Sequence, residues 1–276
     1  MLAIALALAA SVSWGAGDFL GGLTSRRLHV LTVLVVQQVF GLAAAAAWVL
    51  ASGDGFPGWE AAAWAAAGAG GCVGIGALYR GMAIGAMGIV APVSALSAAI
   101  PFAVGIGSGE RPGVLQVAGI ALALVGVAVA SREPADRGGG RAAGIGLALL
   151  AAVGFGLYFV FADRAADASV PFAVATARGV SLGVALAAAL AVGASVRAGR
   201  SFLPALVAIG MCDVGANMLF SVATTHGYLS IVSVLSALYP VMTVALAALV
   251  LHERVARTQR AGVVGALAGA ALITAG

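Results

Sequence analysis

Charged and amide side chains lie within long apolar segments of this sequence, where each needs a polar partner. Arg178 lies deep inside one such segment, and Asp213 and Asn217 lie four residues apart in the next, hence on one face of a helix. An arginine at this depth needs an anionic partner, so we predict that Arg178 and Asp213 approach each other or share a water-filled cavity. The three residues either line a pathway for a polar or charged solute, or form a structural ion pair that locks the two segments together.

Two polar residues near the N-terminus are candidates for the same pathway. Asp18 lies toward the end of the first apolar segment and Gln38 within the second. Alignment of the two halves of the chain puts Gln38 opposite Arg178, so this position is polar in both halves. Asp18 has an alternative place at the membrane interface, where it would pair with Arg26 or Arg27.

Prolines and hydroxyl groups interrupt two further apolar segments. A proline inside a helix removes a backbone hydrogen bond and kinks the helix, leaving carbonyl groups that can face a cavity. Neighbouring hydroxyl groups can contact a solute there, or bond back to their own helix. We expect kinks at Pro92, Pro101 and Pro240, and pathway hydroxyls at Ser94, Ser236 and Tyr239.

The composition of the chain indicates a membrane protein. Hydrophobic residues make up 62% of the sequence and charged residues 9%, whereas an ordinary soluble domain has about 25% charged residues. The basic residues are all arginines in short loops apart from Arg178, which does not indicate nucleic-acid binding. Cys72 and Cys212 lie in apolar segments without the spacing of metal ligands, so we expect small core residues, with no disulfide, metal or cofactor.

Ten apolar segments are long enough to cross a bilayer, which needs about 20 helical residues. They lie near residues 2–23, 29–51, 58–80, 84–107, 112–131, 142–163, 169–195, 202–224, 228–251 and 257–275. The only polar linker of any length contains a glycine run and follows the fifth segment. We therefore divide the chain into residues 1–131, a linker at 132–141, and residues 142–276.

The second half of the chain repeats the first. IVAPVSAL at residues 89–96 recurs as IVSVLSAL at residues 231–238, and each copy is followed by an apolar run that ends in Glu-Arg, at 110–111 and 253–254. Five spans per repeat is an odd number, so the two copies have opposite orientations in the bilayer. The sequence thus predicts an all-α integral membrane protein with ten transmembrane helices in two inverted five-helix repeats, an architecture typical of transporters.

The arginines in the loops predict an orientation. Eleven lie in the loops after the odd-numbered spans, and only Arg111 and Arg164 lie after even-numbered spans. Because basic loops stay in the cytoplasm, both termini are expected outside. The glutamates that end the fourth and ninth spans, Glu110 and Glu253, either bind helix N–H groups or arginines at the turn, or act in gating.

These features resemble a known family, the EamA-like branch of the drug/metabolite transporter superfamily. The matching stretches are WGAGD at 14–18, residues 85–101 with GERP at 109–112, residues 227–240 with HER at 252–254, and QVAGIALALVGV at 116–127. The resemblance implies a central cavity lined by spans 1 to 4 and 6 to 9. It also implies alternating-access transport of small metabolites, often export of amino acids or toxic compounds.

Two features depart from the family pattern. The stretch from Pro101 to Glu110 is four residues shorter than that from Pro240 to Glu253, so the halves are not equivalent. Members of the family are also commonly drawn with both termini in the cytoplasm, opposite to the orientation that the arginines predict.

We expect a secondary transporter, because the sequence contains no GxxxxGK[ST] nucleotide-binding motif. Its substrate would be a small polar metabolite such as an amino acid, or a drug-like compound. If transport is driven, protons are the natural coupling ion, with Asp213 or Asp18 as the titrating group. The 7% share of aromatic residues favours a polar metabolite over a hydrophobic cation.

An integral-membrane enzyme that acts on a lipid-linked substrate is the alternative function. Such enzymes usually gather acids or histidines at the membrane edge, whereas the ten acidic residues here are scattered. Abundant alanine, glycine and arginine without lysine point to a bacterial chain, and we place it in the inner membrane as a multi-pass monomer or homodimer.

Overall fold

Helices form all the regular secondary structure in the residues that the computed structural model describes, which are 1–85, 87–130, 141–251 and 256–275. The predicted linker falls almost wholly outside the described residues, as do Glu253 and Arg254. The helices of the first half are α1 (Leu2–Thr24), α2 (Val30–Ser52), α3 (Trp59–Gly68), α4 (Gly71–Ile84), α5 (Met87–Ser94), the 3-10 helix η1 (Ala95–Ala98), α6 (Ala99–Gly107) and α7 (Val114–Ala130). Those of the second half are α8 (Arg141–Ala166), α9 (Val170–Ala191), η2 (Arg200–Phe202), α10 (Leu203–Thr224), α11 (Leu229–Ser236), α12 (Tyr239–Val250) and α13 (Arg257–Ala275).

Side-chain caps set two of these helix ends. His29 precedes α2, and its imidazole accepts a hydrogen bond from the backbone N–H of Leu31. Ser169 precedes α9 and accepts from the N–H of Phe172. In both helices the cap satisfies an N–H group that has no partner inside the helix. Gly53 ends α2 with a φ of 69°, a conformation that glycine adopts readily.

Eight spans in the described part of the chain are long and apolar enough to cross a membrane. They are Leu2–Thr24, Val30–Ser52, Trp59–Ile84, Val90–Gly107, Gly144–Ala166, Val170–Ala191, Arg200–Thr224 and Leu229–Val250. The segments predicted at 112–131 and 257–275 contain the shorter apolar helices Val114–Val129 and Arg260–Ala275. Helix α13, Arg257–Ala275, has the bounds that the sequence predicts for the tenth segment, and α7, Val114–Ala130, covers most of the fifth.

Three of the predicted spans are broken rather than continuous. The span containing Pro92 and Pro101 divides into α5, η1 and α6, and the 3-10 turn lies between the two prolines. The repeat-related span divides into α11 and α12, and Pro240 is the second residue of α12, where its missing N–H is tolerated. The third break separates α3 from α4 at Ala69–Gly70, where the sequence gives no proline.

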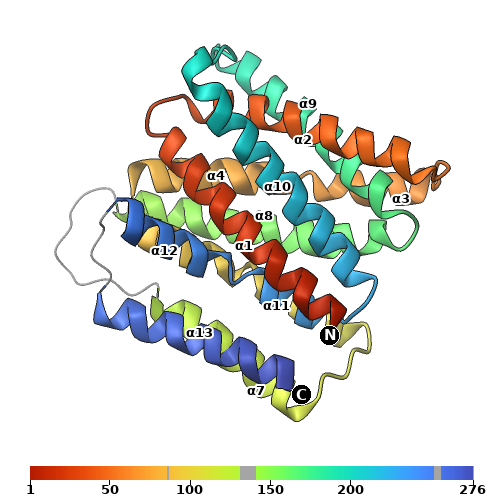
Figure 1. The fold of residues 1–276 in the computed structure, drawn as a ribbon, viewed down its shortest axis with the longest axis vertical. Coiled ribbons are helices and arrows are strands. Elements are labelled where there is room, and N and C mark those ends of the chain that lie inside the picture. The colour runs from red at the N-terminus through yellow and green to blue at the C-terminus, as the bar shows by residue number, and fades with distance from the viewer. Residues whose placement is uncertain (86, 131–140, 252–255, 276) are drawn as a thin grey trace.

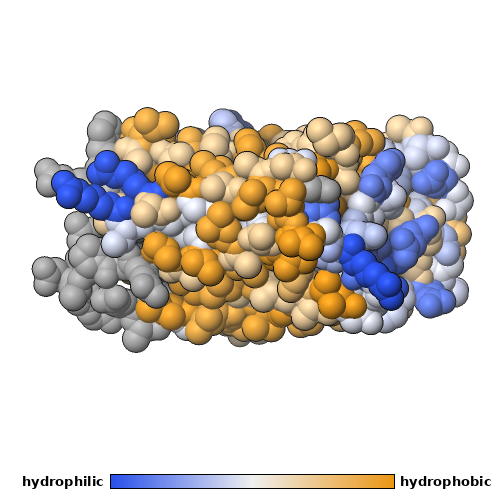
Figure 2. Space-filling model, turned by 90° about the horizontal axis from the view of Figure 1, so that it is seen from below, coloured by the Kyte–Doolittle hydropathy of each residue, from blue (hydrophilic) through white to orange (hydrophobic). Residues whose placement is uncertain are grey.

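The helices run side by side, and partners far apart in the sequence lie together (Figure 1). Helix α1 packs on α10, α2 on α9, and α4 on α8, so that the two halves interleave rather than forming separate domains. Both ends of the chain lie at the same end of the helices. Hydrophobic residues form a band across the middle of the molecule, with hydrophilic residues toward its two ends (Figure 2). This distribution fits a protein surrounded by lipid.

Helices α7 and α13 form a close antiparallel pair at one edge of the molecule (Figure 1). A Cβ atom added to Gly119 would lie 2.6 Å from the carbonyl oxygen of Gly269, and one added to Gly126 would lie 2.7 Å from that of Gly262. Only glycine permits this approach at both places, because any side chain would overlap backbone atoms.

Candidate functional site

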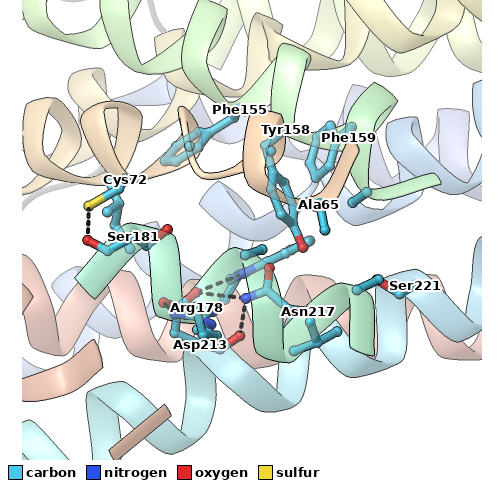
Figure 3. A pocket seen from close by; sticks show the side chains of 18 of the residues that line it. Ala65, Cys72, Phe155, Tyr158, Phe159, Arg178, Ser181, Asp213, Asn217 and Ser221 are labelled. Carbon is cyan, nitrogen blue, oxygen red and sulfur yellow. Dashed lines mark hydrogen bonds and ion pairs between the residues drawn. The ribbon is translucent and has the colours of Figure 1, made fainter. Parts of the chain in front are cut away.

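A cavity of about 810 Å³, counting the part open to solvent, lies between helices of the two halves (Figure 3). Residues of α1 to α4 from the first half line it, together with residues of α8, α9, α10 and α12 from the second. The polar lining residues are Asp18, Gln38, Cys72, Arg178, Ser181, Asp213, Asn217, Ser221 and the hydroxyl-bearing rings Tyr158 and Tyr239. The cavity therefore opens inside spans that are otherwise apolar.

Arg178 joins the two halves of the chain at this cavity. Its Nη1 group donates to the Oδ2 atom of Asp213 at 2.6 Å and to the Oε1 atom of Gln38, also at 2.6 Å. The predicted approach of Arg178 to Asp213 is thus confirmed. Gln38, which the repeat alignment places opposite Arg178, contacts it directly. All three side chains are buried.

The second carboxylate oxygen of Asp213 is also satisfied. Its Oδ1 atom accepts hydrogen bonds from Asn217 Nδ2 at 3.1 Å and from the indole N–H of Trp14 at 3.2 Å. Asn217 and Asp213 lie on one face of α10, as their spacing predicts, and Figure 3 shows both beside Arg178. Each oxygen of this buried carboxylate therefore has a donor, and its charge has a cation.

Asp18 lies on the same helix as Trp14 and one turn away from it, and it also lines the cavity. The residue is only 4% exposed. Among the residues that the structure describes, the Asp18 carboxylate has no hydrogen-bond or ion-pair partner. The alternative placement, in which Asp18 pairs with Arg26 or Arg27 at the interface, is therefore wrong.

Aromatic rings form a wall of the cavity. The Trp14 ring centroid lies 5.6 Å from that of Phe159 and 6.3 Å from that of Tyr158. Phe155 and Tyr239 meet edge to face, with centroids 6.3 Å apart. In Figure 3 the Tyr158 ring extends from α8 toward Arg178 and Asn217, so the aromatic wall meets the polar cluster.

Two of the predicted pathway hydroxyls do not line the cavity. Ser94 forms a short hydrogen bond with the hydroxyl group of Tyr239 and also donates to the carbonyl of Ala91. Ser236 donates to the carbonyl of Ala7 at 3.4 Å. The family resemblance implies that spans 1 to 4 and 6 to 9 line the cavity. All of them contribute described lining residues except the fourth, the kinked span that contains Pro92 and Pro101.

Apart from Tyr239, the residues of the aromatic wall were not predicted from the sequence. Phe155, Tyr158, Phe159 and Ala162 follow a spacing of three or four residues, which places them on one face of α8. This spacing was the available signal, but it also fits a helix face packed in the core. Cys72, expected in the core, is buried and lines the cavity, and its thiol donates to the carbonyl of Ser181 at 3.4 Å. In the described part of the chain no three His, Cys, Asp or Glu residues gather as metal ligands.

Comparisons with known proteins agree with this architecture. One solved crystal structure has a TM-score of 0.79 to this chain at 20% identity, covering 99% of this chain and 96% of the other, which shows a shared fold. A comparison with curated proteins gives no match. The model of the EamA-like transporter family matches residues 1–132 and 142–275. Members of that family are multi-pass membrane transporters of the drug/metabolite transporter superfamily, and this chain belongs to the EamA-like transporter family.

Proposed function

We propose that this protein is a secondary transporter that exports a small polar metabolite such as an amino acid, or a drug-like compound, from a bacterial cell through the inner membrane. The observation that carries the proposal is the cavity between the two halves, in which Arg178, Asp213 and Gln38 meet. Charged groups inside a membrane are costly and are usually retained where a solute or ion passes. Alternating access would arise from rocking of one half against the other around this cavity.

The proposed architecture is ten transmembrane helices in two inverted five-helix repeats, residues 1–131 and 142–276. Two observations support an internal two-fold axis. The contacts of the α7–α13 pair are reciprocal, since Gly119 meets Gly269 and its repeat-related residue Gly262 meets Gly126. Such self-complementary contacts are expected only where repeat-related elements meet at a two-fold axis.

The second observation is the hydrogen bond between Gln38 and Arg178, which lie 140 residues apart. Repeat-related positions touch each other only close to the axis. The polar cluster would therefore lie where the two repeats meet, which is the usual place of a substrate site in transporters of this kind.

Transport can be tested in cells that express the protein, using a labelled panel of amino acids and cationic dyes. We expect one compound class to be depleted from expressing cells and retained by cells that carry the Asp213→Asn variant at equal abundance. Equal depletion by both proteins would make the Arg178–Asp213 pair a structural strut rather than part of the pathway. Failure to move any compound would count against transport and favour the enzyme alternative.

Proton coupling belongs to the same proposal. Asp213 is paired with Arg178, whereas Asp18 has no partner in the described residues, so Asp18 is the better candidate for the titrating group. A buried carboxylate is stable either when it carries a proton or when a cation is paired with it, so Asp18 could release its proton as a cation binds and take it up again when the cation leaves. In proteoliposomes, a pH gradient should accumulate substrate against its concentration gradient. Substrate movement that ignores gradients of either sign would contradict coupling.

A further inference from the structure

The charges that line the cavity do not balance. Asp18, Arg178 and Asp213 are the charged lining residues, and Arg178 is neutralised by Asp213 at 2.6 Å. With every acid ionised, the cavity holds one negative charge more than it holds positive charges, and that charge belongs to Asp18. The cavity is thus complementary to one additional positive charge.

The surroundings of Asp18 fit an organic cation rather than a hydrated metal ion. Trp14 lies one helical turn before Asp18 on α1, and both side chains line the cavity. Tyr158 and Phe159 continue this wall from α8, and Tyr239 lies opposite Phe155. The faces of aromatic rings attract cations, and they also cover flat apolar groups. A carboxylate that lines the same cavity as such rings offers a ligand both a charge partner and an apolar surface.

We propose that the substrate is an organic monocation, in which an ammonium group binds Asp18 and a flat apolar group lies against the aromatic wall. This assignment rests on the proposed transport function and, of the two substrate classes named there, selects the drug-like compound over the amino acid. An anion would have to compete with Asp213 for Arg178 and would leave Asp18 unpaired. A zwitterion would bring a carboxylate into the cavity, but Arg178, which could pair with it, is already paired with Asp213. A monocation satisfies Asp18 without disturbing the Arg178–Asp213 pair.

The overall aromatic content does not oppose this assignment. Only 7% of residues are aromatic, which led us to favour a polar metabolite at the level of composition. Five aromatic residues nevertheless line this one cavity. They are Trp14, Phe155, Tyr158, Phe159 and Tyr239. Recognition depends on where the rings gather rather than on how many the chain contains.

Calorimetric titration of the purified full-length protein in nanodiscs tests the substrate class directly. The probes are phenethylammonium, phenylalanine and 3-phenylpropionate, which share one ring and differ in charge. We expect phenethylammonium to bind about tenfold or more tightly than the other two, because only it pairs with Asp18 without leaving a buried charge unmatched. Tighter binding of phenylalanine or 3-phenylpropionate, or no binding of phenethylammonium up to about 10 mM, would overturn the assignment.

Matched variants separate the carboxylate from the rings. Asp18→Asn keeps the shape of the side chain and should weaken phenethylammonium binding about tenfold or more. Asp167→Asn removes an acid that is exposed outside the cavity, and binding should stay within about twofold. Phe155→Leu keeps an apolar side chain but removes a ring, and should weaken binding about threefold. Unchanged melting temperatures would show that the variants are folded, and unchanged affinity in a folded Asp18→Asn variant would overturn the role of Asp18.

Binding and transport can fail separately. If phenethylammonium does not bind while the cell assay shows export of another compound class, the transporter proposal stands and the substrate class is wrong. If phenethylammonium binds through Asp18 and no compound on the panel is moved, the site is real and the transport proposal is wrong.

Discussion

Arg178 and Asp213 depend on each other, because each carries a charge into a buried site. Asp213→Asn would leave the guanidinium without its counter-charge, and we expect the free energy of unfolding to fall by about 3 kcal/mol. The double variant Arg178→Gln with Asp213→Asn should recover most of that loss, because it removes both charges. Unfolding of the unmutated protein, the two single variants and the double variant in detergent gives the coupling energy of the pair. Losses that simply add would show that the two side chains are energetically independent.

Cys72 gives a test of whether solutes reach the cavity. Its thiol is buried in the protein yet lines the cavity, whereas Cys212 is not among the lining residues. A small thiol-reactive cation should therefore inhibit transport by a Cys212→Ala protein, because the adduct on Cys72 fills part of the cavity. The protein with Cys72→Ala should resist the reagent, and substrate should slow the reaction at Cys72. Equal inhibition of both proteins would mean that the reagent acts elsewhere.

The sequence could predict the polar cluster but not the aromatic wall. An arginine within an apolar span is stable only beside an anionic or polar partner, so Arg178 required a nearby acid. Asp213, with Asn217 on the same helix face, lies in the next apolar segment and is the partner in the structure. Aromatic rings carry no such constraint, because they are equally stable against lipid, in a core or beside a cavity. The place of Phe155 and Tyr158 is decided by how α8 packs against α4 and α3, which periodicity does not specify.

At the scale of elements, a glutamate from one half of the chain caps a helix of the other half. Glu110 follows α6, and its carboxylate accepts from the backbone N–H groups of Leu229 at 2.7 Å and Ser230 at 3.0 Å, the first two residues of α11. Tyr228, at the N-cap of α11, makes no side-chain cap of its own. Binding of helix N–H groups is one of the roles that the sequence offers for Glu110 besides gating, but the capped helix lies about 120 residues further along the chain rather than next to it.

Loss of this cap should be measurable. In Glu110→Ala the two N–H groups lose their acceptor at the positive end of a helix, and we expect the free energy of unfolding to fall by about 1–2 kcal/mol. Glu60→Ala is the matched control, because Glu60 lies at the start of α3 but is exposed. Equal melting temperatures for Glu110→Ala and Glu60→Ala would contradict a stabilising cap.

The helix breaks show which local sequence signals are sufficient to predict where a span is interrupted. Proline explains the 3-10 turn at Ala95–Ala98 and the break before α12, because the ring removes a donor and excludes the preceding turn. The break at Ala69–Gly70 has no such residue, and 40 glycines in the chain make a single glycine uninformative. This break lies where α3 and α4 both pack on α8, so its cause is tertiary.

At the scale of the whole molecule, the pairing of α7 with α13 depends on glycine. In Gly126→Val the added side chain would overlap the backbone of α13 near Gly262 and force the helices apart. We expect a loss of about 1–3 kcal/mol in the free energy of unfolding. Gly183→Val is the control, because nothing lies within 4 Å of a Cβ atom at that helical position. Similar melting temperatures for the two variants would show that the pair does not contribute to stability.

The inverted repeat and the orientation of the molecule both predict on which side of the membrane each loop lies. If the odd-numbered loops are cytoplasmic, Arg197→Cys should react with an impermeant maleimide only after the cells are permeabilised. Gly55→Cys, in the loop after α2 where nothing lies within 4 Å of a Cβ atom, should react in intact cells. The reverse result would place both termini in the cytoplasm, as the family is commonly drawn. In the arrangement of two inverted five-helix repeats, five spans separate these two loops, so the loops must lie on opposite sides of the membrane. Labelling of both positions from the same side would therefore contradict that arrangement.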